Sequence, residues 1–94
     1  MTTFIMFGKY TTESIDKISA ERTESASTII SDCGGVLKDA YALLGETDII
    51  ALVEFPSIEM ALKASVELGR HLGITFKTAP AVSMDEFDKL IAGK

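Results

Sequence analysis

Three segments that read as β-strands, Phe4–Phe7, Ala40–Leu44 and Ile49–Val53, are apolar at nearly every position. In a sheet that exposes one face to water, apolar and polar residues alternate along each strand, and loss of this alternation indicates strands shielded on both faces. The pattern therefore predicts a sheet that needs a second layer on each side.

The same pattern, with its turn residues, predicts four strands: Thr3–Lys9, Val36–Leu44, Asp48–Phe55 and Ile74–Ala79, the last ended by Pro80. Residues 45–47 separate the second strand from the third, which is the length of a tight hairpin. These two strands are therefore expected to pair antiparallel.

Apolar residues spaced three and four apart predict helices between the strands. A first helix ends at Gly34-Gly35, with Ser19 interrupting it as a new N-cap. A second spans Ile58–Leu72 behind Ser57, and the capping box Ser83-Met84-Asp85-Glu86 begins a short third helix with Phe87, Leu90 and Ile91. The expected inward stripes are Ile15, Ile18, Ala26, Ile29, Ile30 and Cys33 on the first helix, and Ile58, Ala61, Leu62, Leu68 and Leu72 on the second.

The resulting order predicts an α+β, ferredoxin-like βαββαβ domain with a short C-terminal helix and a four-stranded antiparallel sheet of order 4-1-3-2. The whole chain, residues 1–94, is expected to be one such domain. Right-handed crossovers place both long helices on one face and leave the other bare. A face-to-face homodimer of the dimeric α/β-barrel type is expected first, and a trimer joined at strand edges second.

Charge and composition narrow the classes of partner. Fourteen acidic and nine basic residues give a net charge of -5, which disfavours nucleic acid as a binding partner because its phosphates are also negative. The sequence shows neither a signal-peptide pattern nor the roughly 20 apolar residues of a membrane span, so a cytoplasmic protein is expected. One cysteine, Cys33, reads as a small buried hydrophobe, and one histidine, His71, as a helix-end residue, so no metal site and no cofactor are predicted.

Candidate chemistry gathers where the end of the first strand meets the start of the third. Lys9 and Tyr10 are expected near Asp48, beside the helix start at Thr11 and Thr12. This group could orient a small anionic or enolisable ligand, with Asp48 as proton acceptor and Lys9 balancing charge. The favoured interpretation is structural: Asp48 accepts backbone hydrogen bonds in the hairpin, and Lys9 forms a weak ion pair at the rim.

Two further residues have a functional and a structural interpretation. Arg22 borders the buried stripe of the first helix, where it could clamp a carboxylate or extend its charged end to water, and the sequence does not separate these. Glu54 could place a carboxylate inside a barrel, but a role at the strand exit, near Pro56, is favoured.

Several short strings occur together in order: Lys9-Tyr10-Thr11, Ser19-Ala20-Glu21-Arg22, Gly34-Gly35, Tyr41, Gly45-Glu46-Thr47-Asp48 and Glu54-Phe55-Pro56. The chain thereby resembles the GYD-domain family, small bacterial and archaeal proteins of the dimeric α/β-barrel type whose function is not established. The resemblance implies the fold and assembly above and also points to Arg22. The chain departs from the family at Thr47, where the family has its tyrosine, and at Ala20, where proline is usual.

Two functions follow as hypotheses. The first is a small oligomeric binding or regulatory module that holds a small anionic metabolite at the sheet edge or between subunits. The second is a cofactor-free enzyme for proton transfer or oxygenation of a small organic substrate. A cavity of roughly 300–1,000 Å³ with converging polar groups would favour an enzyme or a metabolite binder, and a solid interior would favour partner binding.

Overall fold

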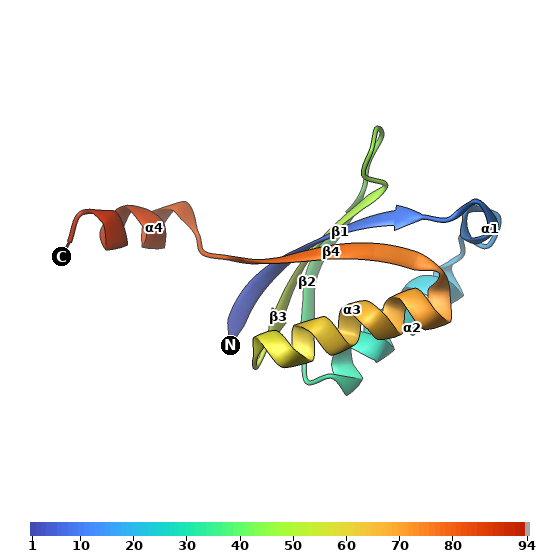
Figure 1. The fold of residues 1–94 in the computed structure, drawn as a ribbon, viewed down its shortest axis with the longest axis horizontal. Coiled ribbons are helices and arrows are strands. Elements are labelled where there is room, and N and C mark those ends of the chain that lie inside the picture. The colour runs from blue at the N-terminus through green and yellow to red at the C-terminus, as the bar shows by residue number, and fades with distance from the viewer. Residues whose placement is uncertain (94) are drawn as a thin grey trace.

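The computed structural model describes residues 1–93 and forms one sheet with its helices (Figure 1). Capping serines fix where three of the helices begin: Ser19, Ser57 and Ser83 each accept a hydrogen bond from the backbone N–H three residues later. The elements are β1 (Thr2–Tyr10), α1 (Thr12–Ile15), α2 (Ala20–Asp32), β2 (Val36–Ala42), β3 (Ile49–Phe55), α3 (Ile58–Leu72), β4 (Ile74–Ala81) and α4 (Met84–Ile91).

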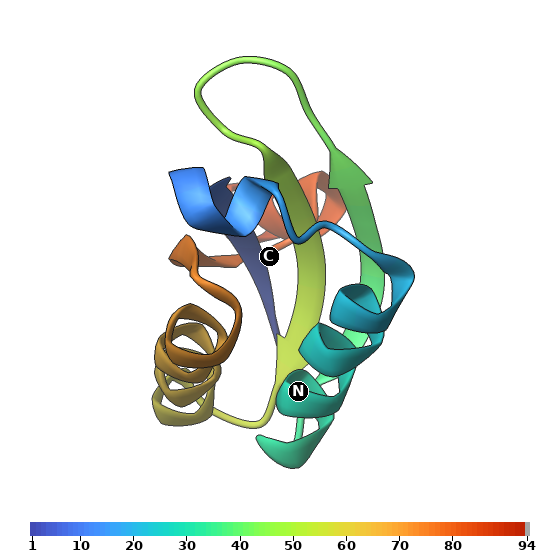
Figure 2. The same ribbon diagram turned by 90° about the vertical axis from the view of Figure 1, so that its right-hand side faces the viewer.

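The four strands form an antiparallel sheet of order β2-β3-β1-β4, which is the predicted order read from the other edge. Phe4 lies opposite Val53 and Met6 opposite Ala51, so these residues share one face. Figure 2 shows α2 and α3 together on one side of the sheet. The α+β, ferredoxin-like prediction is confirmed.

The hydrophobic core lies between this face and the two long helices. Phe4, Met6, Val53 and Phe55 are at most 2% exposed and pack with the inward residues of α3, Ala61, Ala64 and Leu68. A hydrogen bond of 2.6 Å between the Ser65 and Thr78 hydroxyls joins α3 to β4. Alanines at the contact let the helix lie close to the strands, because short side chains permit a short interaxial distance.

Four residues assigned to the inward stripes are instead exposed. Ile15 and Ile18 are 51% and 58% exposed because the chain leaves helical geometry between α1 and Ser19. Ile58 and Leu62 are 56% and 57% exposed. Successive residues of a helix are rotated by about 100° about its axis. Because the side of α3 with Ala61, Ala64 and Leu68 meets the sheet, Ile58 and Leu62 point outward.

Three predicted strand ends are also wrong. β2 stops at Ala42 and β3 begins at Ile49. The Leu43 N–H still donates to the Asp48 carbonyl at 2.8 Å, so the turn contains residues 44–47 instead of the predicted 45–47. β4 continues through Pro80 to Ala81. A proline is tolerated there because β4 is an edge strand, whose outward N–H groups have no ladder partner.

The second face of the sheet carries no layer in the described chain. By strand register it presents an apolar centre, here called the open face, formed by Ile5, Phe7, Tyr41, Ile50, Leu52 and Ala79. Phe7 and Tyr41 are 38% and 61% exposed. This is the two-sided apolar sheet that the missing alternation predicts.

The C-terminal helix α4 leaves the end of β4 and projects away from the body (Figure 1). It is not among the elements that pack extensively on one another within residues 1–93. Across that range, every helix is too short or too polar to cross a membrane.

Candidate functional site

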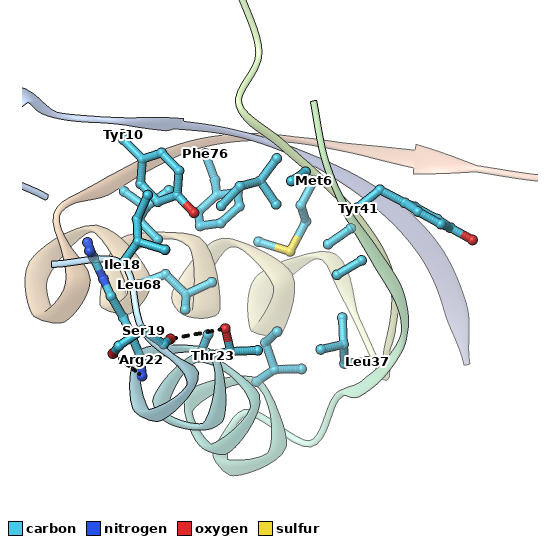
Figure 3. Close-up of a pocket in the computed structure, with 17 residues that line it drawn as sticks. Met6, Tyr10, Ile18, Ser19, Arg22, Thr23, Leu37, Tyr41, Leu68 and Phe76 are labelled. Carbon is cyan, nitrogen blue, oxygen red and sulfur yellow. Dashed lines mark hydrogen bonds between the residues drawn. The ribbon is translucent and has the colours of Figure 1, made fainter. Parts of the chain in front are cut away.

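A cavity of ≈ 270 Å³ lies between α2 and the sheet (Figure 3). It exists because small residues face one another across this gap: Ala26 on α2 and Ala40, Ala42 and Ala51 on the strands. Larger side chains at these positions would close the space, since protein interiors otherwise pack to high density.

The wall of the cavity is mostly apolar and has one polar end. Met6, Ile30, Leu68 and Phe76 contribute to the apolar part. The polar residues at this end are Tyr10, Ser19, Arg22 and Thr23, and Tyr41 lies on the opposite side (Figure 3). In Figure 3 the Tyr10 hydroxyl is turned inward toward Phe76, whereas the Tyr41 ring points away. An apolar chamber with a few polar groups at one end is the usual form of a small-molecule site.

Arg22 closes the polar end and joins three helices. Its guanidinium donates hydrogen bonds to the backbone carbonyls of Ser14 and Leu72, and its carbon Cζ lies 5.7 Å from the centre of the Tyr10 ring. The carbonyls belong to the ends of α1 and α3. That of Ser14 also accepts the backbone N–H of Lys17 at 3.0 Å, and that of Leu72 is the last of α3, where backbone acceptors lack helical partners. Neither predicted interpretation describes this arrangement, because the half-buried side chain binds backbone carbonyls instead of a carboxylate or water.

The structure brings Lys9, Tyr10 and Asp48 together as the sequence predicts. The Tyr10 backbone N–H donates to Asp48 Oδ2 at 2.9 Å, and Lys9 Nζ donates to the Glu46 carbonyl at 2.9 Å. Asp48 thus accepts a backbone hydrogen bond, as the structural interpretation expects, but the donor is Tyr10 at the end of β1 and not a residue of the hairpin. The expected rim ion pair of Lys9 is replaced by a bond to a carbonyl. Of the three residues, only Tyr10 lines the cavity.

Glu54 lies on the other side of the sheet from the cavity. It is half-buried and stands opposite Thr3 on β1 and Val36 on β2, at the margin of the open face. The five candidate residues therefore divide into a cavity pair, Tyr10 and Arg22, a hairpin pair, Lys9 and Asp48, and Glu54 alone.

Sequence reasoning did not identify Ser19 and Thr23 at the mouth, or the alanines that create the space. The available signal was alanine on both the inward stripe of the helix and the facing strands. His71 lies outside the cavity on the surface, with Nε2 3.0 Å from Glu67 Oε2.

Cys33 is buried at the end of α2, with 4% of its surface exposed. Burial raises the pKa of its thiol, opposed by the nearby Lys63 ammonium and reinforced by Glu67 and Asp32. Through residue 93, the structure contains no cluster of three His, Cys, Asp or Glu side chains arranged to hold a metal ion.

The chain was compared with solved structures, with curated proteins and with models of protein families. The leucine response regulatory protein (LrpA) of Mycobacterium tuberculosis has a similar fold, with a TM-score of 0.58 and 8% identity. The match covers 87% of this chain and 51% of the LrpA chain, so this protein spans about half the length of LrpA. A comparison with curated proteins finds no match. The family model for the GYD domain matches residues 4–91, and the chain therefore belongs to the GYD domain family.

Proposed function

We propose that this protein is a small homodimeric binding or regulatory module that holds a compact metabolite in the cavity between α2 and the sheet. The ligand has a mostly apolar body and one anionic or hydrogen-bonding group. The observation that carries the proposal is the ≈ 270 Å³ chamber, apolar along its walls and bordered at one end by Arg22 and the Tyr10 hydroxyl.

The polar end suits an anion for an electrostatic reason. Arg22 keeps its charge at all ordinary pH values and has five N–H donors, two or more of which already serve backbone carbonyls. A guanidinium beside an apolar wall attracts a carboxylate more strongly than it would in water, because the local dielectric constant is lower. At ≈ 270 Å³ the chamber is slightly smaller than the roughly 300–1,000 Å³ of most ligand pockets, which limits the ligand to a small metabolite.

Binding is favoured over proton-transfer catalysis by the composition of the wall. Its titratable side chains are Tyr10, Tyr41 and Arg22, with no carboxylate or imidazole among the lining residues. General acid–base catalysis usually relies on a histidine or carboxylic acid within hydrogen-bond reach of substrate. The nearest sequence-predicted base, Asp48, lies outside the lining and accepts the Tyr10 N–H.

The open face supports the proposed dimer. Four large residues at its centre, Ile5, Phe7, Ile50 and Leu52, form a contiguous apolar surface across β1 and β3. Monomeric proteins rarely leave such a surface in water, and two sheets packed face to face about 10 Å apart would cover it. Light scattering is expected to give twice the 10.1 kDa chain mass, whereas the edge-joined trimer would give three times that mass.

A thermal-shift screen of small carboxylates with aliphatic or aromatic bodies tests the cavity. A ligand that binds only the native state raises the melting temperature by mass action. We expect such compounds to raise the melting temperature of the wild-type protein. They should leave the melting temperature of Ala26→Leu unchanged, because the larger side chain fills the chamber.

Ser27→Leu provides the matched control, since Ser27 is exposed on the same helix and lines no part of the cavity. It should respond to ligand as the wild type does. A compound that stabilises Ala26→Leu equally would show that binding occurs elsewhere. Failure of every carboxylate in the screen to bind would refute the proposed ligand class.

A further inference from the structure

Within residues 1–93, no element packs extensively on the apolar side of α4. Met84, Phe87, Leu90 and Ile91 recur at helical spacing and are 69%, 44%, 74% and 68% exposed. An isolated helix shorter than roughly 12–15 residues is marginal in water, and α4 has 8. The helix therefore needs a surface to pack on, and its own domain does not supply one.

The open face is unevenly charged from end to end. Lys9 and Lys77 lie at the end where β1 finishes, Lys77 opposite Phe7. Glu54 and Asp39 lie toward the other end, Glu54 opposite Thr3 and Asp39 opposite Leu52. Lys38 is exposed in the β2 bulge beside Asp39, and Glu46 lies in the β2–β3 connection beside Lys9. The charged residues paired across the open face, Lys9 and Lys77 against Glu54 and Asp39, still give it a basic end and an acidic end.

This polarity selects one way of joining two copies. A two-fold axis lying between the sheets and across the strands reverses strand direction, so the basic end of each copy meets the acidic end of the other. Other face-to-face orientations with parallel strands would place like charges together. The antiparallel orientation therefore gives charge complementarity as well as apolar burial.

In that orientation α4 lies next to the basic end of the partner. β4 runs opposite to β1 and ends with Ala81 beside Thr3, so α4 leaves the sheet at its acidic end. The partner's basic end lies there. α4 carries Asp85, Glu86 and Asp88, which suit the lysines of that end.

The partner also offers apolar contacts at the same end, toward the opposite edge of the sheet. The two-fold axis stacks β4 over the partner's β4, so α4 must run across the ends of the partner's β1 and β3 to reach the β2–β3 connection. The β2–β3 connection carries Leu43 and Leu44, which are 40% and 103% exposed. Figure 1 shows this connection and α4 as the two parts of the chain that project from the body. Two projecting apolar segments in one chain can cover each other reciprocally in a symmetric dimer.

We propose that α4 of each copy is an exchanged arm that packs its apolar side on Leu43, Leu44 and the basic end of the open face of a second copy. This inference rests on the proposed dimer. The arms add a second apolar patch to the sheet contact, and a stable dimer buries roughly 800 Å² per partner.

Intermolecular NMR tests the arm directly. In a Cys33→Ala background, Lys89→Cys places a spin label on the polar side of α4, and this protein is mixed with ¹⁵N-labelled wild type. We expect line broadening at residues 42–48 and at Lys9 and Lys77 of the ¹⁵N-labelled copy. Broadening on the outer face of α3 instead, near Ile58 and Leu62, would overturn the proposed docking surface.

Dilution measurements provide the second readout. Leu90→Glu and Leu44→Glu should each weaken the dimer at least tenfold, while Leu62→Glu, an equal change on the outer face of α3, should leave it within twofold. Circular dichroism checks that each variant is folded. A wild-type dimer without the broadening, or unaffected by Leu90→Glu, would refute the arm and leave the dimer intact. A wild-type monomer would refute both.

Discussion

At the scale of single residues, backbone groups determine the roles of the charged side chains. Asp48 accepts the N–H of Tyr10, and Arg22 donates to the carbonyls of Ser14 and Leu72. Both side chains hydrogen-bond to backbone groups at the ends of elements, where regular secondary structure leaves some of these groups unpaired. Such residues hold the rim of the cavity in place whether or not they also contact a ligand.

Asp48→Ala is expected to destabilise the protein by about 1–2 kcal/mol, because it removes a hydrogen bond to a charged acceptor and leaves the Tyr10 N–H without its partner. Urea denaturation monitored by circular dichroism measures the change. Glu46→Ala is the control: Lys9 is bound by the backbone carbonyl of residue 46, so stability should stay within about 0.5 kcal/mol. Equal stability of the two variants would contradict the structural role of Asp48.

Cys33 predicts a dependence of stability on alkaline pH. Because burial raises the pKa of the thiol in the folded protein, the unfolded chain ionises at lower pH than the native one. The contribution of the neutral Cys33 thiol to stability is fully present below the pKa that the thiol has in the unfolded chain. It is lost as pH rises through the higher pKa of the folded protein. Wild-type stability should therefore fall in this window more steeply than that of Cys33→Ala, as measured by urea midpoints, and parallel curves would contradict the prediction.

At the scale of elements, local rules account for the helices well. Serine caps, the Gly34 turn with φ 76° and the left-handed Gly73 with φ 67° mark helix ends that can be predicted from sequence. The helix faces were harder to predict. Ile58 and Leu62 satisfy helical periodicity as well as Ala61 and Ala64 do, and only the close approach of α3 to the sheet selects the alanines.

Ala20→Pro is expected to stabilise α2 by about 0.4–1 kcal/mol. Ala20 is the first helical residue after the Ser19 cap, a position where proline fits because its fixed φ is helical and the missing N–H has no intrahelical partner. A higher melting temperature measures the gain. Ala26→Pro, inside the same helix, should destabilise strongly, and a loss of stability in Ala20→Pro would show that the start of α2 is strained.

At the scale of the whole molecule, two apolar surfaces, the open face and α4, lie outside the core. A monomer would expose both to water, which would cost stability and solubility. Phe7→Glu is expected to weaken the proposed dimer by roughly 30-fold or more, since a buried charge at the centre of an interface costs at least ~2 kcal/mol. Analytical ultracentrifugation measures the dissociation constant, and an unchanged value would remove the open face from the interface.

The sequence by itself determined the order of elements, the topology of the sheet and the apolar character of its second face. These follow from local periodicity, capping residues and chain connectivity, all of which act between near neighbours. It also predicted that Lys9, Tyr10 and Asp48 would meet, because antiparallel pairing of two strands fixes which ends adjoin.

Only the tertiary structure decided where empty space remains and which groups border it. The cavity depends on alanines from α2, β2 and β3 facing one another, and the position of Arg22 depends on carbonyls from α1 and α3. Distances between segments far apart in the chain arise from packing, which no single periodic pattern encodes. The projection of α4 away from the body is likewise a property of the folded chain.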